Sequence, residues 1–184
     1  MRSIKMICLT LVFVLSLCLQ VDSAARYETL YHLVKTGRVV KVWIGEIMNS
    51  TGNREITSER FAAVLKNALE KRKSANFVLV NNTRDADICI NADIEKYDYR
   101  KVDPIDNAIG WPALAMDAMI KENYVALRVK YIVKDPKKGR VIWSKTLRPS
   151  VTKLDMPEEG CLPLVLAEAG RVFLSHCFKR PPKK

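Results

Sequence analysis

The sequence is poor in the residues and motifs on which most enzymes depend. Its two histidines, His32 and His176, lie near opposite ends of the 184 residues, so a histidine-based nucleophile system would require distant parts of the chain to meet. No G-x-S-x-G, Walker, G-x-G-x-x-G or H-E-x-x-H motif is present. The acidic run from Asp85 to Asp98 could hold a carboxylate pair, but a solvated strand face is the commoner meaning of such a run. We therefore expect a protein without catalytic activity, metal or cofactor.

Cysteines are also few, and beyond the first 25 residues only Cys89, Cys161 and Cys177 remain. Cys161 and Cys177 bracket a predicted helix, and at about 1.5 Å per residue they are too far apart to bond along it. Their spacing matches no metal site. We expect buried thiols in place of a disulfide framework.

The long apolar run of the sequence is confined to the N-terminus, where residues 1–25 have the features of a secretory signal peptide. A basic start precedes the apolar residues 6–19, and residues 23–25, Ser-Ala-Ala, suit cleavage. The run is short for a membrane span. Residues 15–18, Leu-Ser-Leu-Cys, approach a bacterial lipobox but have leucine where a small residue is usual. Cleavage before residue 26 is therefore the expected processing, and Cys18 as a lipid anchor is the alternative.

The rest of the chain is strongly basic. Loss of the leader leaves 29 basic against 19 acidic residues, spread over one expected domain at residues 26–178 and a basic, disordered tail at 179–184. Such an excess suits an acidic partner, namely anionic lipid, lipopolysaccharide or nucleic acid, and it also suits plain solubility. The export signal argues against nucleic acid. We expect an exported, periplasmic protein.

The strongest structural signal is a β-hairpin from Tyr124 to Leu147. Apolar residues alternate with mainly basic ones from Val125 to Lys134, which is the period of a half-buried strand. Residues 135–139, Asp-Pro-Lys-Lys-Gly, supply a turn. The sequence therefore predicts two long antiparallel strands with one basic face.

Weaker patterns surround the hairpin. Strands are predicted at residues 38–47, 76–80 and 88–99, helices at 58–73 and 163–177, and a loop at 148–159. Thr57 or Ser58 can cap the first helix, and Pro163 suits the first turn of the second. This order predicts an α+β fold with a mainly antiparallel four- to five-stranded sheet and two helices packed on one face.

The segment 101–121 is unusually long for a connection between two strands, and such connections are often functional. Its apolar part is predicted either to form a short helix on the core or to expose a patch that binds a partner or a membrane surface. The candidate partner-binding residues are Trp111, Leu114, Met116, Met119 and Ile120.

The ordered set of motifs resembles bacterial envelope proteins around the lipopolysaccharide-assembly lipoprotein LptE. The matching pieces are the strand 39–47 with the turn Asn49-Ser50-Thr51-Gly52-Asn53, the helix end Ala68-Leu69-Glu70, the strand 77–80, the pair Ala86-Asp87, and the hairpin motif Lys138-Gly139-Arg140-Val141-Ile142-Trp143. The resemblance covers residues 38–177. Similar turn and hairpin motifs also mark the curli-secretion lipoprotein CsgG and the penicillin-binding-protein activator LpoB.

The resemblance implies a protein at the outer membrane that supports a β-barrel partner and contacts lipopolysaccharide through basic residues of its sheet. Charge and strand position select the candidate ligand-binding residues Lys96, Arg100, Lys101, Arg128 and Lys130. The alternative is a CsgG- or LpoB-like envelope protein that forms a self-oligomer or regulates a cell-wall enzyme.

Overall fold

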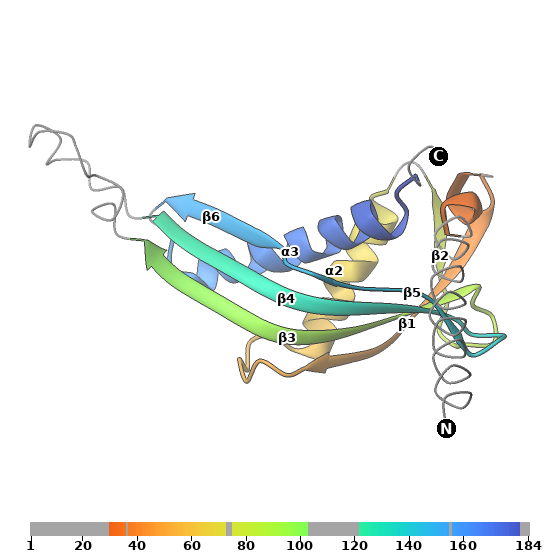
Figure 1. Cartoon of the computed structure of the whole chain (residues 1–184), viewed down its shortest axis with the longest axis horizontal. Helices are drawn as coiled ribbons and strands as arrows, with labels where there is room; N and C mark the ends of the chain where they lie inside the picture. Colours follow the sequence, from red (N-terminus) through yellow and green to blue (C-terminus); the bar gives the residue numbers. More distant parts are fainter. Residues whose placement is uncertain (1–29, 36, 73–74, 103–121, 155, 181–184) are drawn as a thin grey trace, which may run out of the picture.

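The computed structural model describes residues 30–35, 37–72, 75–102, 122–154 and 156–180 (Figure 1). Its elements are β1 (Val39–Asn49), α2 (Ser58–Glu70), β2 (Asn76–Leu79), β3 (Ile88–Val102), β4 (Glu122–Asp135), β5 (Arg140–Leu147), β6 (Ser150–Leu154) and α3 (Glu158–Cys177). Residues 30–35 are also helical. The predicted signal peptide, Cys18, the tail beyond residue 180 and the five candidate partner-binding residues between 111 and 120 lie outside the described residues.

The fold is α+β, as predicted, but its sheet is mixed. The described residues form six strands, with β2-β1-β3-β4-β5 as the hydrogen-bonded order and β6 paired with β4 beyond the end of β5. The β3–β4, β4–β5 and β4–β6 pairs are antiparallel, whereas β1 runs parallel to both β2 and β3. A helical crossover between β1 and β2 makes that pair parallel. Three of these five strand pairs are antiparallel, as expected for most of the sheet, but the parallel pairs of β1 and the sixth strand correct the expectation of four to five strands.

The predicted hairpin is confirmed as β4 and β5, joined by a turn in which Gly139 has φ +63°. Two expectations at the C-terminal end were wrong. Residues 148–159 do not form a plain loop, because β6 occupies Ser150–Leu154 and pairs with β4. Helix α3 begins at Glu158 with Pro157 as its N-cap residue, which puts Pro163 inside the helix and not in its first turn.

The core lies between the sheet and the two helices, which Figure 1 shows on the same face of the sheet. Phe173 of α3 stacks on Tyr131 of β4 at a centroid distance of 4.7 Å, and Phe61 of α2 lies 6.3 Å from the same tyrosine ring. The predicted burial of the three thiols is confirmed: Cys89, Cys161 and Cys177 are buried and form no disulfide. The helices therefore cover the inner face and leave the outer face of β3 and β4 exposed.

A candidate anion-binding hollow on the outer face of the sheet

A β-bulge in β3 decides which of its residues reach the outer face. Up to Ile94, the even-numbered residues face the core, and Ile94 pairs with Val129 of β4. The next paired residue is Lys96, opposite Arg128, so the register shifts between Ile94 and Lys96. Because side chains alternate along a strand, one extra residue reverses the faces beyond it. Lys96, Asp98 and Arg100 therefore point outward.

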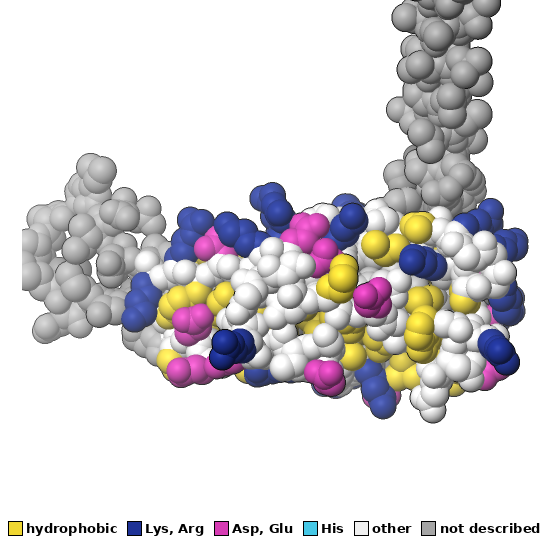
Figure 2. All heavy atoms as spheres, turned by 90° about the horizontal axis from the view of Figure 1, so that it is seen from below, with side chains coloured by type: hydrophobic (Ala, Val, Ile, Leu, Met, Phe, Trp, Pro, Cys, Tyr) yellow, Lys and Arg dark blue, Asp and Glu magenta, His cyan; other side chains and the backbone are white. Residues whose placement is uncertain are grey.

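These side chains surround a hollow of about 470 Å³, here called the basic hollow. It is lined by Lys96, Asp98, Arg100, Tyr124, Ala126, Leu127, Arg128 and Arg148. Four of the eight lining side chains are cationic, and one is a carboxylate. Figure 2 shows Lys and Arg side chains gathered along one edge of the molecule, with Asp and Glu between them. The hollow therefore carries a local positive excess.

The acidic residues around the basic hollow hold its cations in place without neutralising them all. Asp98 accepts a hydrogen bond from Arg100 at 2.9 Å and lies 3.8 Å from the Lys96 ammonium. The hydrogen bond from Arg100 lowers the pKa of Asp98, so this carboxylate stays charged at neutral pH. Glu95, displaced outward at the bulge, pairs with Arg128 at 2.8 Å. Two carboxylates thus face four cations.

Arg148 is the cation that sequence reasoning missed. It precedes the buried Pro149 in the short link between β5 and β6, and the Leu127 N–H donates to the Pro149 carbonyl at 2.9 Å. This bond holds the link against β4 and places Arg148 at the basic hollow. Arg148 forms no salt bridge with any other described residue. The only signal in the sequence was a positive charge in an expected loop.

The five sequence-predicted ligand residues divide into three groups. Lys96, Arg100 and Arg128 line the basic hollow together. Lys130 lies on the same outer face, two residues along β4, but does not line the hollow. Lys101 lies on the opposite face, beside Glu158 and Glu159 at the start of α3. The bulge explains this separation, because it turns Arg100 outward and the residue after it inward.

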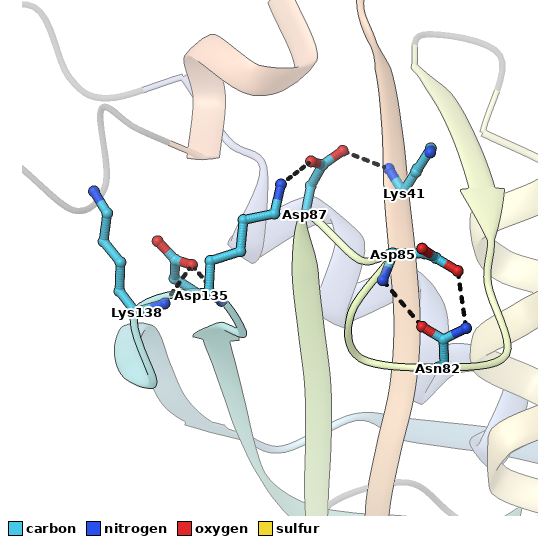
Figure 3. Close-up of polar contacts among 7 residues, drawn as sticks. Lys41, Asn82, Asp85, Asp87, Asp135 and Lys138 are labelled. Atoms are coloured by element: carbon cyan, nitrogen blue, oxygen red, sulfur yellow. Dashed lines mark hydrogen bonds and ion pairs between the residues drawn. The ribbon is translucent and has the colours of Figure 1, made fainter.

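The carboxylates at the other end of the sheet stabilise turns. Figure 3 shows Asp87 accepting the Lys41 N–H, a bond of 3.0 Å. The Lys137 ammonium lies 3.7 Å from the same carboxylate. Asp135 accepts the backbone N–H of Lys138 at 3.1 Å in the β4–β5 turn, and the Asp85 N–H donates to Asn82 at 3.0 Å in the loop before β3. These contacts hold neighbouring backbones together and pair no two carboxylates for proton transfer.

Two negative findings concern the described part of the chain. It contains no group of three or more His, Cys, Asp or Glu side chains placed to hold a metal ion. No helix formed by the described residues is both long enough and apolar enough for a membrane crossing.

Comparisons with known proteins give distant structural similarity only. No protein-family model matches the chain, and no curated protein matches it. Among solved structures, a PelC dodecamer from Paraburkholderia phytofirmans aligns with 18% identity over 77% of this chain and 89% of that one, at a TM-score of 0.45. A minor lipoprotein from Acinetobacter baumannii aligns with 15% identity over 78% and 95%, at 0.44. The rare lipoprotein B from Shewanella oneidensis aligns with 10% identity over 73% and 91%, at 0.39. Similarity at this level assigns neither a family nor a function.

Proposed function

We propose that this chain is a non-enzymatic accessory protein of the bacterial envelope that binds lipopolysaccharide at the outer face of its sheet. In this role it works in the periplasm at the outer membrane and supports lipopolysaccharide assembly beside a β-barrel partner. The observation that carries the proposal is the basic hollow, where Lys96, Arg100, Arg128 and Arg148 converge from three parts of the chain. The secretory leader predicted at residues 1–25 agrees with an envelope location.

The chemistry of the hollow suits a phosphorylated headgroup. Guanidinium groups donate paired N–H bonds to phosphate oxygens in a planar fork, and lysine adds a point charge. Arg148, which has no salt bridge within the described residues, is available to a phosphate without first leaving a carboxylate. Arg100 and Arg128 are already oriented by Asp98 and Glu95, which reduces the side-chain entropy that binding would cost.

Charge reversal on the outer face tests the proposal. The mature protein, residues 26–184, is titrated with purified lipopolysaccharide, and binding is followed by calorimetry. We expect the double variant Arg128→Glu/Lys130→Glu to bind at least about tenfold more weakly, because each reversal replaces attraction with repulsion. Circular dichroism checks that the exposed substitutions leave the fold intact. Unchanged binding by a folded double variant would contradict the site.

A matched pair of single variants distinguishes binding at the basic hollow from general attraction to the net charge of the protein. Arg148→Glu and Lys101→Glu change the net charge equally, but Arg148 lines the basic hollow and Lys101 lies on the opposite face. We expect only Arg148→Glu to weaken lipopolysaccharide binding. Equal losses in both variants would indicate non-specific attraction to a basic protein.

The partner is tested by affinity purification from gently solubilised native envelopes. Recovery of an outer-membrane β-barrel protein in near-equal amount supports the assembly role. Recovery of the chain alone, as a large oligomer by sedimentation, would contradict that role and favour the alternative of a self-assembling envelope protein.

A further inference from the structure

A second hollow, of about 570 Å³, lies between α2 and α3 on the exposed side of the helix pair. It is here called the helix groove, and its lining residues are Val64, Asn67, Ala68, Lys71, Arg72, Ala167, Arg171, Leu174 and Ser175. The core-facing residues Leu65, Leu69 and Phe173 do not line it, whereas Asn67, Ala167 and Ser175 are exposed. The helix groove therefore faces away from the sheet and from the basic hollow.

Small residues shape the helix groove. The two helices approach closely at Gly170, where an added Cβ would lie 3.0 Å from the Ala68 Cβ and 3.3 Å from a Val64 methyl group. Val64, Ala68 and Leu174 form the apolar floor of the groove. On the α3 side, the small side chains of Ala167 and Ser175 leave its wall shallow. A valley between two helices accepts the side-chain ridge of a third helix, whose apolar residues recur every three to four positions.

The rim of the helix groove is cationic. Lys71 and Arg72 stand at the end of α2, and Arg171 projects from α3, while none of the described lining residues is acidic. Arg72 is held in place because it donates to the Leu174 carbonyl at 2.8 Å and lies 5.3 Å from the centre of the Phe178 ring. Arg171 is oriented along its own helix by two hydrogen bonds to Glu168. Fixed cations beside an apolar floor complement a helix with acidic flanks.

We infer that the helix groove is a docking site for an acidic amphipathic helix of a partner protein. The apolar stripe of that helix lies on Val64, Ala68 and Leu174, and its flanking carboxylates pair with Lys71 and Arg171. This surface is separate from the basic hollow, so the protein can hold an anionic lipid on one face and a protein partner on the other.

The test uses two synthetic helical peptides of 18 residues with the same leucine stripe. One has glutamate on both flanks of the stripe and the other has lysine. Binding of each labelled peptide to the mature protein at physiological salt is measured by fluorescence anisotropy. We expect saturable binding of the acidic peptide, at least about tenfold tighter than that of the basic peptide, because the rim attracts one and repels the other.

Variants locate the binding. Ala167→Trp fills the helix groove, and Lys71→Glu/Arg171→Glu reverses the charge of its rim. Each variant is expected to bind the acidic peptide at least about tenfold more weakly. The matched controls are Ala63→Trp and Lys66→Glu, at exposed α2 positions outside the groove. Both controls should bind as the parent protein does. Arg128→Glu/Lys130→Glu, which tests the outer sheet face, should also leave peptide binding unchanged.

Three results would overturn the inference. These are absence of saturable binding by the acidic peptide, equal binding of the basic peptide, and equal losses in the groove and control variants. A fourth result would overturn it as well. If anionic vesicles displaced the acidic peptide, and still did so in Arg128→Glu/Lys130→Glu, the groove would be assigned to a lipid. None of these outcomes depends on whether lipopolysaccharide binds the outer sheet face.

Discussion

At the scale of single residues, Gly45 is a position where only hydrogen fits. It lies where β1 shifts register against β3, and an added Cβ would overlap with the Asn91 side-chain oxygen and lie 2.9 Å from the Cys89 sulfur. The same Asn91 oxygen accepts the Glu46 N–H at 3.0 Å. The asparagine thus satisfies a backbone donor that the irregular register leaves without a strand partner.

We predict that Gly45→Ala destabilises the protein by about 1–3 kcal/mol, because the new methyl group displaces Asn91 and leaves the Glu46 N–H unsatisfied. Urea unfolding measures the loss. In Gly45→Ala/Asn91→Ala the overlap with the Asn91 side chain is gone, although the close approach to the Cys89 sulfur remains. The double variant should therefore lose less stability than the sum of the single losses. Strict additivity would show that the overlap with Asn91 is not the cause.

Tyr131 gives a prediction about pH. Its side chain is fully buried, and its hydroxyl donates to the Ala169 carbonyl at 3.0 Å. Burial raises the pKa of Tyr131 far above its ordinary value near 10. The unfolded chain therefore releases this proton first as pH rises, so the stability that Tyr131 contributes is complete below about pH 10 and declines above it.

We expect the free energy of unfolding to decline more steeply with pH above about 10 in the parent protein than in Tyr131→Phe. At neutral pH the variant should lose about 1 kcal/mol for the missing hydrogen bond. Urea unfolding from pH 7 to pH 11 measures both effects. Identical slopes of unfolding free energy against pH in the two proteins would contradict the assignment of this loss to the raised pKa of Tyr131.

At the scale of elements, the start of α2 shows how a cap sets a boundary. Thr57 is the N-cap residue and its hydroxyl accepts the Arg60 N–H at 3.1 Å, which confirms one of the two predicted caps. Ser58 has another role, because its hydroxyl donates to the Ile47 carbonyl at 2.8 Å and ties the helix start to β1. The N-cap hydrogen bond of Thr57 and the hydrogen bond from Ser58 to β1 together orient α2 on the sheet.

Replacement of Thr57 by alanine should destabilise the protein by about 1 kcal/mol, because one helix N–H loses its acceptor. Thr57→Ser keeps an equivalent hydroxyl and serves as the control. Thermal unfolding by circular dichroism compares the three proteins. A loss in Thr57→Ser as large as that in Thr57→Ala would point to the lost methyl group and not to the cap.

At the scale of the whole molecule, the positive excess of the chain predicts how ligand binding responds to salt. Screening shortens the range of electrostatic attraction from about 10 Å at 0.1 M salt to about 3 Å at 1 M. The lipopolysaccharide binding that we propose should therefore weaken at least about tenfold between 50 and 500 mM NaCl. Calorimetric titration at several salt concentrations measures the response. Binding that stays constant over this range would indicate that acyl chains and not phosphates hold the ligand.

Local sequence patterns predict some elements of the whole fold and not others. The β4–β5 hairpin follows from short-range periodicity and from its turn residues, so the sequence was sufficient to predict it. Strand β6 could not be predicted from local patterns, because its five residues form a strand only by pairing with β4, which is distant in sequence. The early start of α3 is not predictable from Pro163, because proline favours the first turn of a helix and this helix begins five residues before it.

The sequence by itself determined the α+β class, the turn at residues 135–139 and the basic character of the β4 outer face. Each depends on residues close together in the chain. Tertiary structure alone decided the composition of the basic hollow. The bulge before Lys96 reverses the face of every later residue in β3, so Arg100 joins the hollow and Lys101 does not. Arg148 joins it only because the β5–β6 link folds back onto β4. Register and long-range pairing are properties of two strands together, and no single segment contains them.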